Sequence, residues 1–374
     1  MSRKKRWMDV ISIPVISILL SMSVAAVILL ALGKNPVTAL TAFLKGSGLM
    51  RKPNYAGGQS MMTDFASFLG ILTPMLLASL GVIVAMKTGL FNIGMAGQML
   101  LSGFAASVLV GYSNLPGIVA RPLVILIGIA VGGAIGALIG FLKYRFNVHE
   151  VVTSIMLNYI VSYVTGFFIN TYYVDPVTRM SRTISPSARL TIADVPMGGV
   201  KMSFPLGIIL AIVMVFAVQF ILERTTLGYR LKAVGKNRDC AYYAGINVGK
   251  NMVIAMMISG ILGGLAGVTY YLGYFNQIVP KDLAGLGYDS IAVSVLGNVN
   301  PIGAVFASAL ITIFQKGSVY MSSTVGVPKE IASVVTGILL LFSACGGYIR
   351  YVLKRRQDRM RQPAVKPSEK EEDK

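Results

Sequence analysis

The chain has 374 residues, of which 55% are hydrophobic and only 13% charged, with a mean hydropathy of +0.69. A soluble domain carries about 25% charged residues, so this composition excludes a water-soluble enzyme. The same apolar content excludes a disordered chain. Two cysteines exclude a disulfide framework, and one histidine excludes a histidine-based metal site. The net charge of +19 would also fit a nucleic-acid-binding protein, but the cations flank long apolar runs, as in membrane proteins.

Ten apolar runs predict an all-α polytopic membrane protein with about ten transmembrane segments. They cover residues 10–32, 65–86, 92–110, 123–142, 151–172, 204–222, 252–272, 288–297, 302–320 and 331–349. A bilayer-spanning helix needs about 20 apolar residues. The first run is too long for a cleaved signal peptide, whose apolar stretch has roughly 7–15 residues. The basic segment 1–9 that precedes it predicts a cytoplasmic N-terminus.

The short run 288–297 decides the predicted topology. As a helix it would be only about 15 Å long. If it crosses, or pairs as a broken helix, the basic tail 351–374 lies inside the cell together with the basic linkers 143–150 and 223–250, as the positive-inside rule requires. We therefore expect a membrane domain over residues 10–350 with both termini cytoplasmic. Basic residues in two outer loops disagree with this rule, although long loops obey it less strictly.

Two glycine-rich stretches suggest an inverted repeat. Residues 89–107 and 285–308 each combine a glycine-rich turn, a polar pair and a helix of small residues, and they begin on opposite sides of the predicted membrane. Inverted repeats with broken helices are typical of transporters. Chance similarity between two glycine- and alanine-rich helices is the alternative.

Polar side chains inside the apolar runs are the candidates for a solute pathway. Such groups are costly in lipid and usually face a bundle interior or a pathway, although bonding between helices explains any one of them equally well. Acids are nearly absent from mid-span, which argues against ion coupling and favours a neutral solute. The pathway candidates are Asn92, Gln98, Asn158, Tyr159, Asp289 and Asn298.

No enzyme site, metal site or cofactor site is predicted. The sequence has no G-x-x-x-x-G-K-[ST] phosphate-binding loop, so the chain is not expected to bind or hydrolyse a nucleotide through such a loop. His149 has no nucleophile at a recognisable spacing and is interpreted as a solvated loop histidine.

The linker 223–250 is predicted to form two short helices on the membrane surface. Thr225 and Thr226 favour a helix start, and Gly235 favours its end. A second helix is expected from Arg238 to residue 244, ended by Gly245. Short amphipathic helices suit docking into a partner's groove, while a loop held by lipid headgroups is the alternative.

Four stretches carry a resemblance to a family. The linker resembles the coupling loop of ATP-binding-cassette (ABC) importer permeases of the sugar and nucleoside branch, T-x-x-G-x-x-x-x-A-V-G-x-N-x-x-A-A-x-x-x-G-I, and departs from it at Cys240, where alanine is usual. GLFNIGMAGQ at 89–98, with Ala96 in place of a frequent glutamate, EVVTSIMLNYI at 150–160, and DSIAVSVLGNVNP at 289–301 resemble further segments of that family. The stretch 150–160 is most similar to the nucleoside type.

The resemblance implies a permease subunit without its own ATPase. Two permeases, identical or different, would form the pathway, and an extracytoplasmic binding protein would deliver the solute. A cytoplasmic ATPase would dock on the coupling residues Thr225, Gly228, Arg230, Ala233, Gly235, Asn237, Ala241 and Gly245. Purine nucleosides are the first expectation, with riboflavin or a sugar as other solutes. An autonomous secondary carrier or facilitator remains the rival function.

Overall fold

The structure is a computed structural model, and it describes residues 22–31, 33–52, 60–197 and 200–326 together with a few isolated positions outside these ranges. A helical segment, Met22–Ala31, comes first. The helices that follow are α2 (Pro36–Gly46), α3 (Ser60–Lys87), α4 (Met95–Ala106), α5 (Gly117–Phe146), α6 (Glu150–Phe168), α7 (Gly207–Arg224), α8 (Thr226–Lys236), α9 (Arg238–Tyr243), α10 (Val248–Thr269), α11 (Gly285–Leu296) and α12 (Pro301–Val325). Short π-helical turns extend α4, α6 and α10.

The described helices confirm a multi-pass membrane architecture. Six are long and apolar enough to cross a bilayer: Met61–Lys87, Gly117–Phe146, Glu150–Tyr173, Gly207–Arg224, Val248–Tyr274 and Pro301–Val325. Three shorter apolar helices, Met22–Ala31, Met95–Gly111 and Gly285–Leu296, coincide with three further predicted runs. The tenth run, 331–349, and the terminal segments 1–9 and 351–374 fall outside the ranges that the structure describes well.

The all-α expectation is wrong at one place. Strands β1 (Thr191–Met197) and β2 (Val200–Pro205) pair antiparallel between α6 and α7. This segment follows a long irregular loop, and it contains too few consecutive apolar residues to continue a helix. Pairing the two strands satisfies their backbone groups, which a solitary extended chain would have to leave to water.

Two antiparallel helices, α3 and α10, form the centre of the bundle. A Cβ at Gly70, early in α3, would lie 2.9 Å from the ring of Tyr274 beyond the end of α10, whereas one at Gly81 would lie 2.8 Å from the Ser259 carbonyl oxygen near its middle. Residue numbers therefore rise along one helix as they fall along the other. Every large side chain of α3 between residues 75 and 85 is fully or almost fully buried.

Glycines let α5 lie directly against α10. A Cβ at Gly132 would lie 2.7 Å from the Cα of Gly264, and a Cβ at Gly260 would lie 2.9 Å from the Cα of Gly136. Both distances are shorter than any real Cβ contact, so these positions need glycine. Small residues at such a contact bring backbones together where no hydrophobic effect drives helix association.

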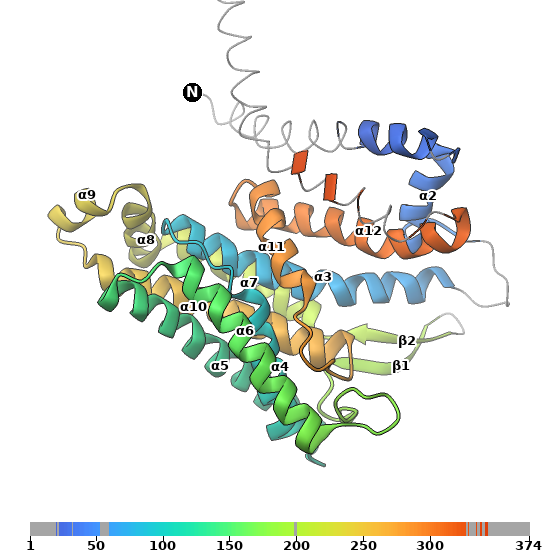
Figure 1. The fold of residues 1–374 in the computed structure, drawn as a ribbon, viewed down its shortest axis with the longest axis horizontal. Helices are drawn as coiled ribbons and strands as arrows, with labels where there is room; N and C mark the ends of the chain where they lie inside the picture. The colour runs from blue at the N-terminus through green and yellow to red at the C-terminus, as the bar shows by residue number, and fades with distance from the viewer. Residues whose placement is uncertain are drawn as a thin grey trace, which may run out of the picture.

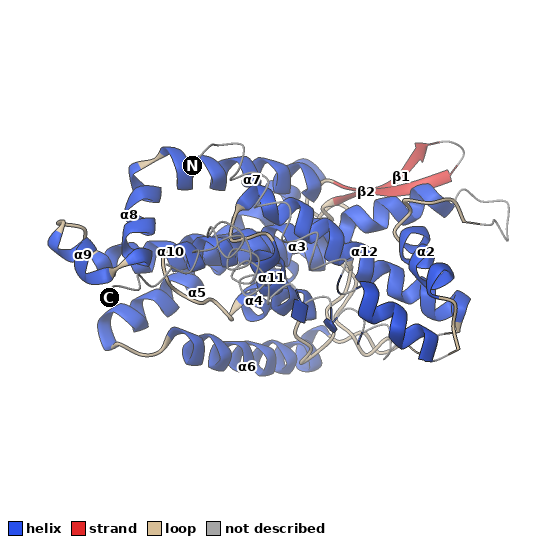
Figure 2. Cartoon of the chain, turned by 90° about the horizontal axis from the view of Figure 1, so that it is seen from above, coloured by secondary structure: helices blue, strands red, loops and turns tan. Residues whose placement is uncertain are grey.

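The two ends of the bundle carry different elements. Figure 1 shows α8 and α9 at its left end and the β1–β2 hairpin at its right end, and Figure 2 shows the same separation from above. We call these ends the loop face and the hairpin face. Helix α3 runs toward the loop face, since its last residue, Lys87, lies against Gly235 of α8.

Each half of the chain packs its last two helices on the leading helix of the other half. Helices α4 and α5 follow α3 in the sequence but both pack on α10. Helices α11 and α12 follow α10 but both pack on α3. Each half thus consists of a long helix, a short helix and a long helix, and the two leading helices run in opposite directions.

Candidate functional site

The segment between α3 and α4 is a break inside the membrane domain. Helix α3 ends at Lys87, the chain turns at Gly89 with φ +70°, and residues 90–93 continue without helical structure to the start of α4. Asn92, fully buried, holds this segment in place. Its amide nitrogen donates to Ser259 Oγ of α10 (2.8 Å) and to Gln98 Oε1 (3.2 Å), and its Oδ1 accepts from the Gly94 backbone N–H (2.9 Å).

Asn158 of α6 ties the same segment from the other side. Its Oδ1 accepts from the Gly97 N–H (2.9 Å), and its amide nitrogen donates to the Ile93 carbonyl (3.1 Å) and to the Tyr288 hydroxyl of α11 (3.4 Å). Asn158 is 2% exposed. The predicted residues Asn92, Gln98 and Asn158 therefore form one buried network that joins α4, α6, α10 and α11. Their hydrogen-bonding groups bond to one another and to the backbone, which fixes the broken segment.

Tyr159, the next residue along α6, points the opposite way. It is 57% exposed and shares a face with Tyr163, whose ring lies 5.7 Å from Lys281 Nζ. Helix α7 differs, because its exposed side chains before Glu223 are all apolar: Ile209, Ile212, Val213, Phe216 and Phe220. We call the exposed surface of Tyr159 and Tyr163 the tyrosine face. Mid-span hydroxyls are unsuited to lipid, so this face suits contact with solute or another protein.

Asp289 and Asn298 lie in the second half of the fold. Asp289 accepts a hydrogen bond from the Gln315 side-chain amide (2.6 Å), which links α11 to α12. Asn298 and Val299 have φ of 56° and 50° in the turn between these helices, and Asn300 caps α12 by accepting from the Ile302 N–H (2.9 Å). This turn is the second break in the membrane domain.

The two predicted helices of the linker are confirmed as α8 and α9. Thr225 Oγ1 accepts from the Gly228 N–H (3.1 Å) and donates to the Ile221 carbonyl (2.6 Å), so it starts α8 and anchors it to α7. Asn237 Oδ1 accepts from the Cys240 N–H (3.0 Å) and starts α9. Ala241 is buried, Ala233 is half-buried, and Arg230 is exposed to solvent. Helix α8 continues one residue past the predicted end at Gly235, and Gly245 follows α9 with φ +76°.

These two helices touch the first break directly. A Cβ at Gly235 would overlap the Lys87 carbonyl oxygen and lie 3.0 Å from the Gly89 nitrogen. The Arg238 guanidinium donates to the Gly89 carbonyl (3.4 Å). Gly228 is held equally closely, since a Cβ there would lie 2.6 Å from the Cα of Leu222. The two surface helices are therefore in direct contact with the turn that leads to Asn92.

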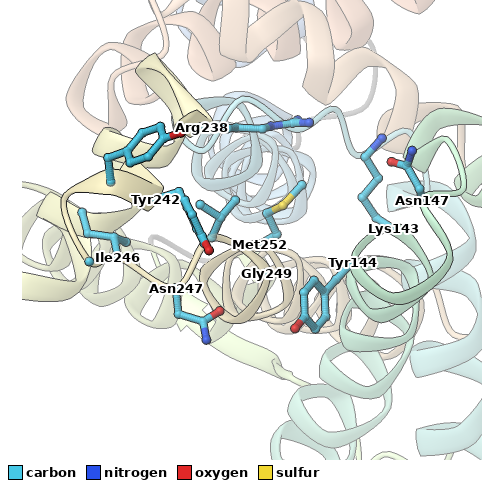
Figure 3. Close-up of a pocket in the computed structure, with 12 residues that line it drawn as sticks. Lys143, Tyr144, Asn147, Arg238, Tyr242, Ile246, Asn247, Gly249 and Met252 are labelled. Atoms are coloured by element: carbon cyan, nitrogen blue, oxygen red, sulfur yellow. The ribbon is translucent and has the colours of Figure 1, made fainter. Parts of the chain in front are cut away.

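A pocket of about 800 Å³ opens on the loop face beside α9. The last turn of α5, helix α9 and the first turn of α10 enclose it (Figure 3). Arg238 and Lys143 reach into its upper part, and tyrosines form much of its wall. Lys143 also pairs with Glu150 at 3.1 Å. We call it the loop-face pocket. Among the residues that the structure describes, no group of three His, Cys, Asp or Glu side chains is placed to hold a metal ion.

Comparison with known proteins identifies the family. The model of the family described as branched-chain amino acid transport system / permease component matches residues 65–344. The chain belongs to this family. It is therefore a permease component of an ABC transporter.

Individual relatives resemble the permease over most of its length. The nucleoside ABC transporter permease NupB of Lactococcus lactis is 32% identical over 96% of this chain and 95% of its own. The guanosine ABC transporter permease NupP of Bacillus subtilis is 35% identical over 91% of this chain and 95% of its own. A solved inward-facing ABC transporter, described as of metal-chelate type, covers 86% of this chain and 97% of its own at 13% identity, with a TM-score of 0.46.

Sequence reasoning missed several residues that shape the permease's site. Ser259, Tyr288 and Arg238 contact the predicted residues, yet none was a candidate. Tyr288 directly precedes Asp289 at the start of a short polar run, which is a signal that could have found it. Ser259 and Arg238 have no such signal, because only the packing of α10 and α9 brings them to the break.

Proposed function

We propose that this permease moves a purine nucleoside across the cytoplasmic membrane by alternating access, driven by a separate ABC ATPase. The observation that carries this proposal is its likeness, over at least 91% of its length, to permeases named for nucleoside and guanosine transport. A further nucleoside permease of Lactococcus lactis, NupC, is 28% identical, so that organism has two related permeases. We infer that the present chain likewise pairs with a second permease subunit.

The exchanged packing of the two halves supports the inverted repeat. Helices α3 to α5 and α10 to α12 follow the same long–short–long order in opposite directions, with a break beside each short helix. We infer a domain over residues 10–350 with ten membrane segments and both ends in the cytoplasm. In this topology the loop face is cytoplasmic and the hairpin face is external, where a substrate-binding protein would dock.

The tyrosine face suits a pathway between two permeases. Tyrosine rings offer flat surfaces for a purine and hydroxyls for the ribose and the base edges. The buried network around Asn92 and Asn158 holds this face in place, because Asn158 fixes α6 against the first break and directly precedes Tyr159. Asp289, Gln98 and Asn298 support the two breaks that would move during gating.

Coupling to the ATPase is assigned to α8 and α9. Both helices lie on the loop face, and their exposed surface includes Arg230, Asn237 and Gly245. Gly235 and Arg238 connect this surface to the turn at Gly89. An ATPase that closes on ATP would push α8 and α9, and the rigid contact would carry the displacement to the first break.

Reconstitution tests the proposal. The permease is placed in liposomes with its partner permease, ATPase and binding protein, and uptake of radiolabelled guanosine is measured with and without ATP. We expect ATP-dependent uptake in the complete system and none from the permease alone. Uptake by the permease alone would establish the rival, an autonomous carrier. ATP-dependent uptake of glucose or riboflavin without guanosine would refute the choice of solute.

A further inference from the structure

The loop-face pocket lies outside the proposed solute pathway and beside the proposed coupling helices, and it has the properties of a ligand site. Its volume of about 800 Å³ falls within the range of roughly 300–1,000 Å³ typical of small-molecule sites. The end of α5 and the distant segment from α9 to the start of α10 form it, and its floor includes the buried Met252. It lies on the loop face, beside the helices that contact Gly89.

Two cations converge on the upper part of the pocket. Figure 3 shows Arg238 of α9 extending toward Lys143 of α5. An ammonium group has three donors, so the single ion pair of Lys143 with Glu150 leaves two for a ligand. The Arg238 guanidinium has five, and its bond to the Gly89 carbonyl is long, at 3.4 Å. Arg and Lys together suit a phosphate group, which accepts several charge-assisted hydrogen bonds.

Aromatic rings form the opposite part of the wall. Tyr144 is pressed against the α10 backbone, because a Cβ at Gly249 would fall within its ring. Tyr242 points into the pocket from α9, and its side chain is 70% exposed. Exposed ring faces at a binding site bind flat heterocycles by stacking. A free phosphate or a lipid headgroup would leave these rings unused.

We propose that the loop-face pocket binds a nucleoside monophosphate, with its phosphate between Arg238 and Lys143 and its base against Tyr242 or Tyr144. A guanidinium that turns to a phosphate gives up its bond to the Gly89 carbonyl. Occupancy therefore loosens the contact between α9 and the first break, and it lowers transport. This regulatory consequence rests on the proposed function, because the ligand then carries the same base as the imported solute. Its concentration in the cell would reflect the supply of that solute.

Binding is tested with the full-length permease in nanodiscs of phosphatidylcholine. Equilibrium dialysis measures the affinity for radiolabelled guanosine 5′-monophosphate, guanosine and inorganic phosphate. We expect saturable binding of the monophosphate, with affinities at least tenfold weaker for the other two. Arg238→Ala should weaken binding at least tenfold and Arg238→Lys less. Tyr242→Leu should weaken it at least threefold.

Two control variants remove a cation or an aromatic ring that lies outside the pocket. Lys250→Ala removes an exposed cation from the first turn of α10, and Tyr229→Leu removes an exposed ring from α8; both should keep wild-type affinity. Equal affinity of Arg238→Ala and the wild type would overturn the proposal, as would equal affinity for phosphate and the monophosphate. Loss of binding in nanodiscs with phosphatidylglycerol would overturn it too, by identifying a lipid headgroup as the occupant.

The regulatory step is tested in the reconstituted importer. Guanosine 5′-monophosphate enclosed on the ATPase side should lower guanosine uptake at least fivefold in the wild type and not in Tyr242→Leu. Unchanged wild-type uptake despite measured binding would refute the regulation. Nucleotide binding without any guanosine uptake would refute the proposed function while leaving the pocket assignment intact.

Discussion

Gly235 offers the sharpest test of how α8 is connected to the membrane domain. An alanine Cβ there would overlap the Lys87 carbonyl oxygen and lie 2.9 Å from the Lys87 carbonyl carbon and 3.0 Å from the Gly89 nitrogen. These atoms are backbone, so no flexible side chain can move aside. Relieving the overlap requires α8 to shift by about 1 Å from the turn, within the range of overpacking changes that cost ~1–3 kcal/mol.

The expected result of Gly235→Ala is uncoupling. A penalty of ~1–3 kcal/mol in the coupled state corresponds to a roughly 5- to 150-fold lower uptake per ATP hydrolysed. The assay measures guanosine uptake and phosphate release in the same proteoliposomes. Basal ATP hydrolysis should remain near the wild-type rate, because the exposed surface of α8 and α9 is unchanged.

Gly285→Ala is the matched control. A Cβ at Gly285 has no heavy atom within 4 Å, so this variant should keep the wild-type ratio of uptake to hydrolysis. If Gly235→Ala also keeps that ratio, the contact between α8 and the turn at Gly89 does not transmit motion. If it abolishes hydrolysis as well, the residue acts in docking rather than in transmission.

Three further predictions follow from the site. Asn158→Leu leaves the Gly97 N–H and its other partners unpaired, so the free energy of unfolding should fall by about 1–3 kcal/mol for each, seen as a lower melting temperature in detergent, whereas the exposed Asn170→Leu should melt like the wild type. Tyr159→Leu should raise the KM for guanosine uptake roughly tenfold or more, and Phe216→Leu on α7 should not; equal KM values would remove Tyr159 from the pathway. In the loop between α6 and β1, the hydrogen bond from the Val177 N–H holds the pKa of Asp175 below its ordinary value of 3.8. The stabilisation that the ionised Asp175 carboxylate gives the loop is therefore complete above pH 3.8, and it is lost as the pH falls through the lowered pKa. Hydrogen exchange of the Val177 amide, corrected for its intrinsic rate, should accelerate over that range in the wild type and stay constant in Asp175→Asn.

The local patterns of the sequence predicted most helices well. Apolar runs long enough for a bilayer fixed the six long spans, because burying a helix in lipid depends on the length and composition of one segment. Caps act over three or four residues, so Thr225 predicted the start of α8, whereas the cap that Asn237 gives α9 became visible in the structure. The motif at 89–98 likewise indicated a glycine-rich turn before a helix, and the structure begins α4 at Met95.

The site depends on contacts between segments far apart in the chain. Asn92 looked like part of a membrane helix that begins at residue 92, but it lies in the break before α4 and bonds to Ser259, 167 residues away. Tyr159 and Asn158 are neighbours of similar polarity, and only the packing of α6 decided that one is buried and the other exposed.

Composition and motifs by themselves therefore determined a helical membrane protein, its long spans, its surface helices and its family. The tertiary structure decided which polar side chains meet, that α8 touches the turn at Gly89, that β1 and β2 pair as a hairpin, and that a pocket opens beside α9. The reason is physical. Span length and capping are local free energies that adjacent residues set, whereas hydrogen bonds between helices depend on rotations and crossings that only the whole bundle fixes.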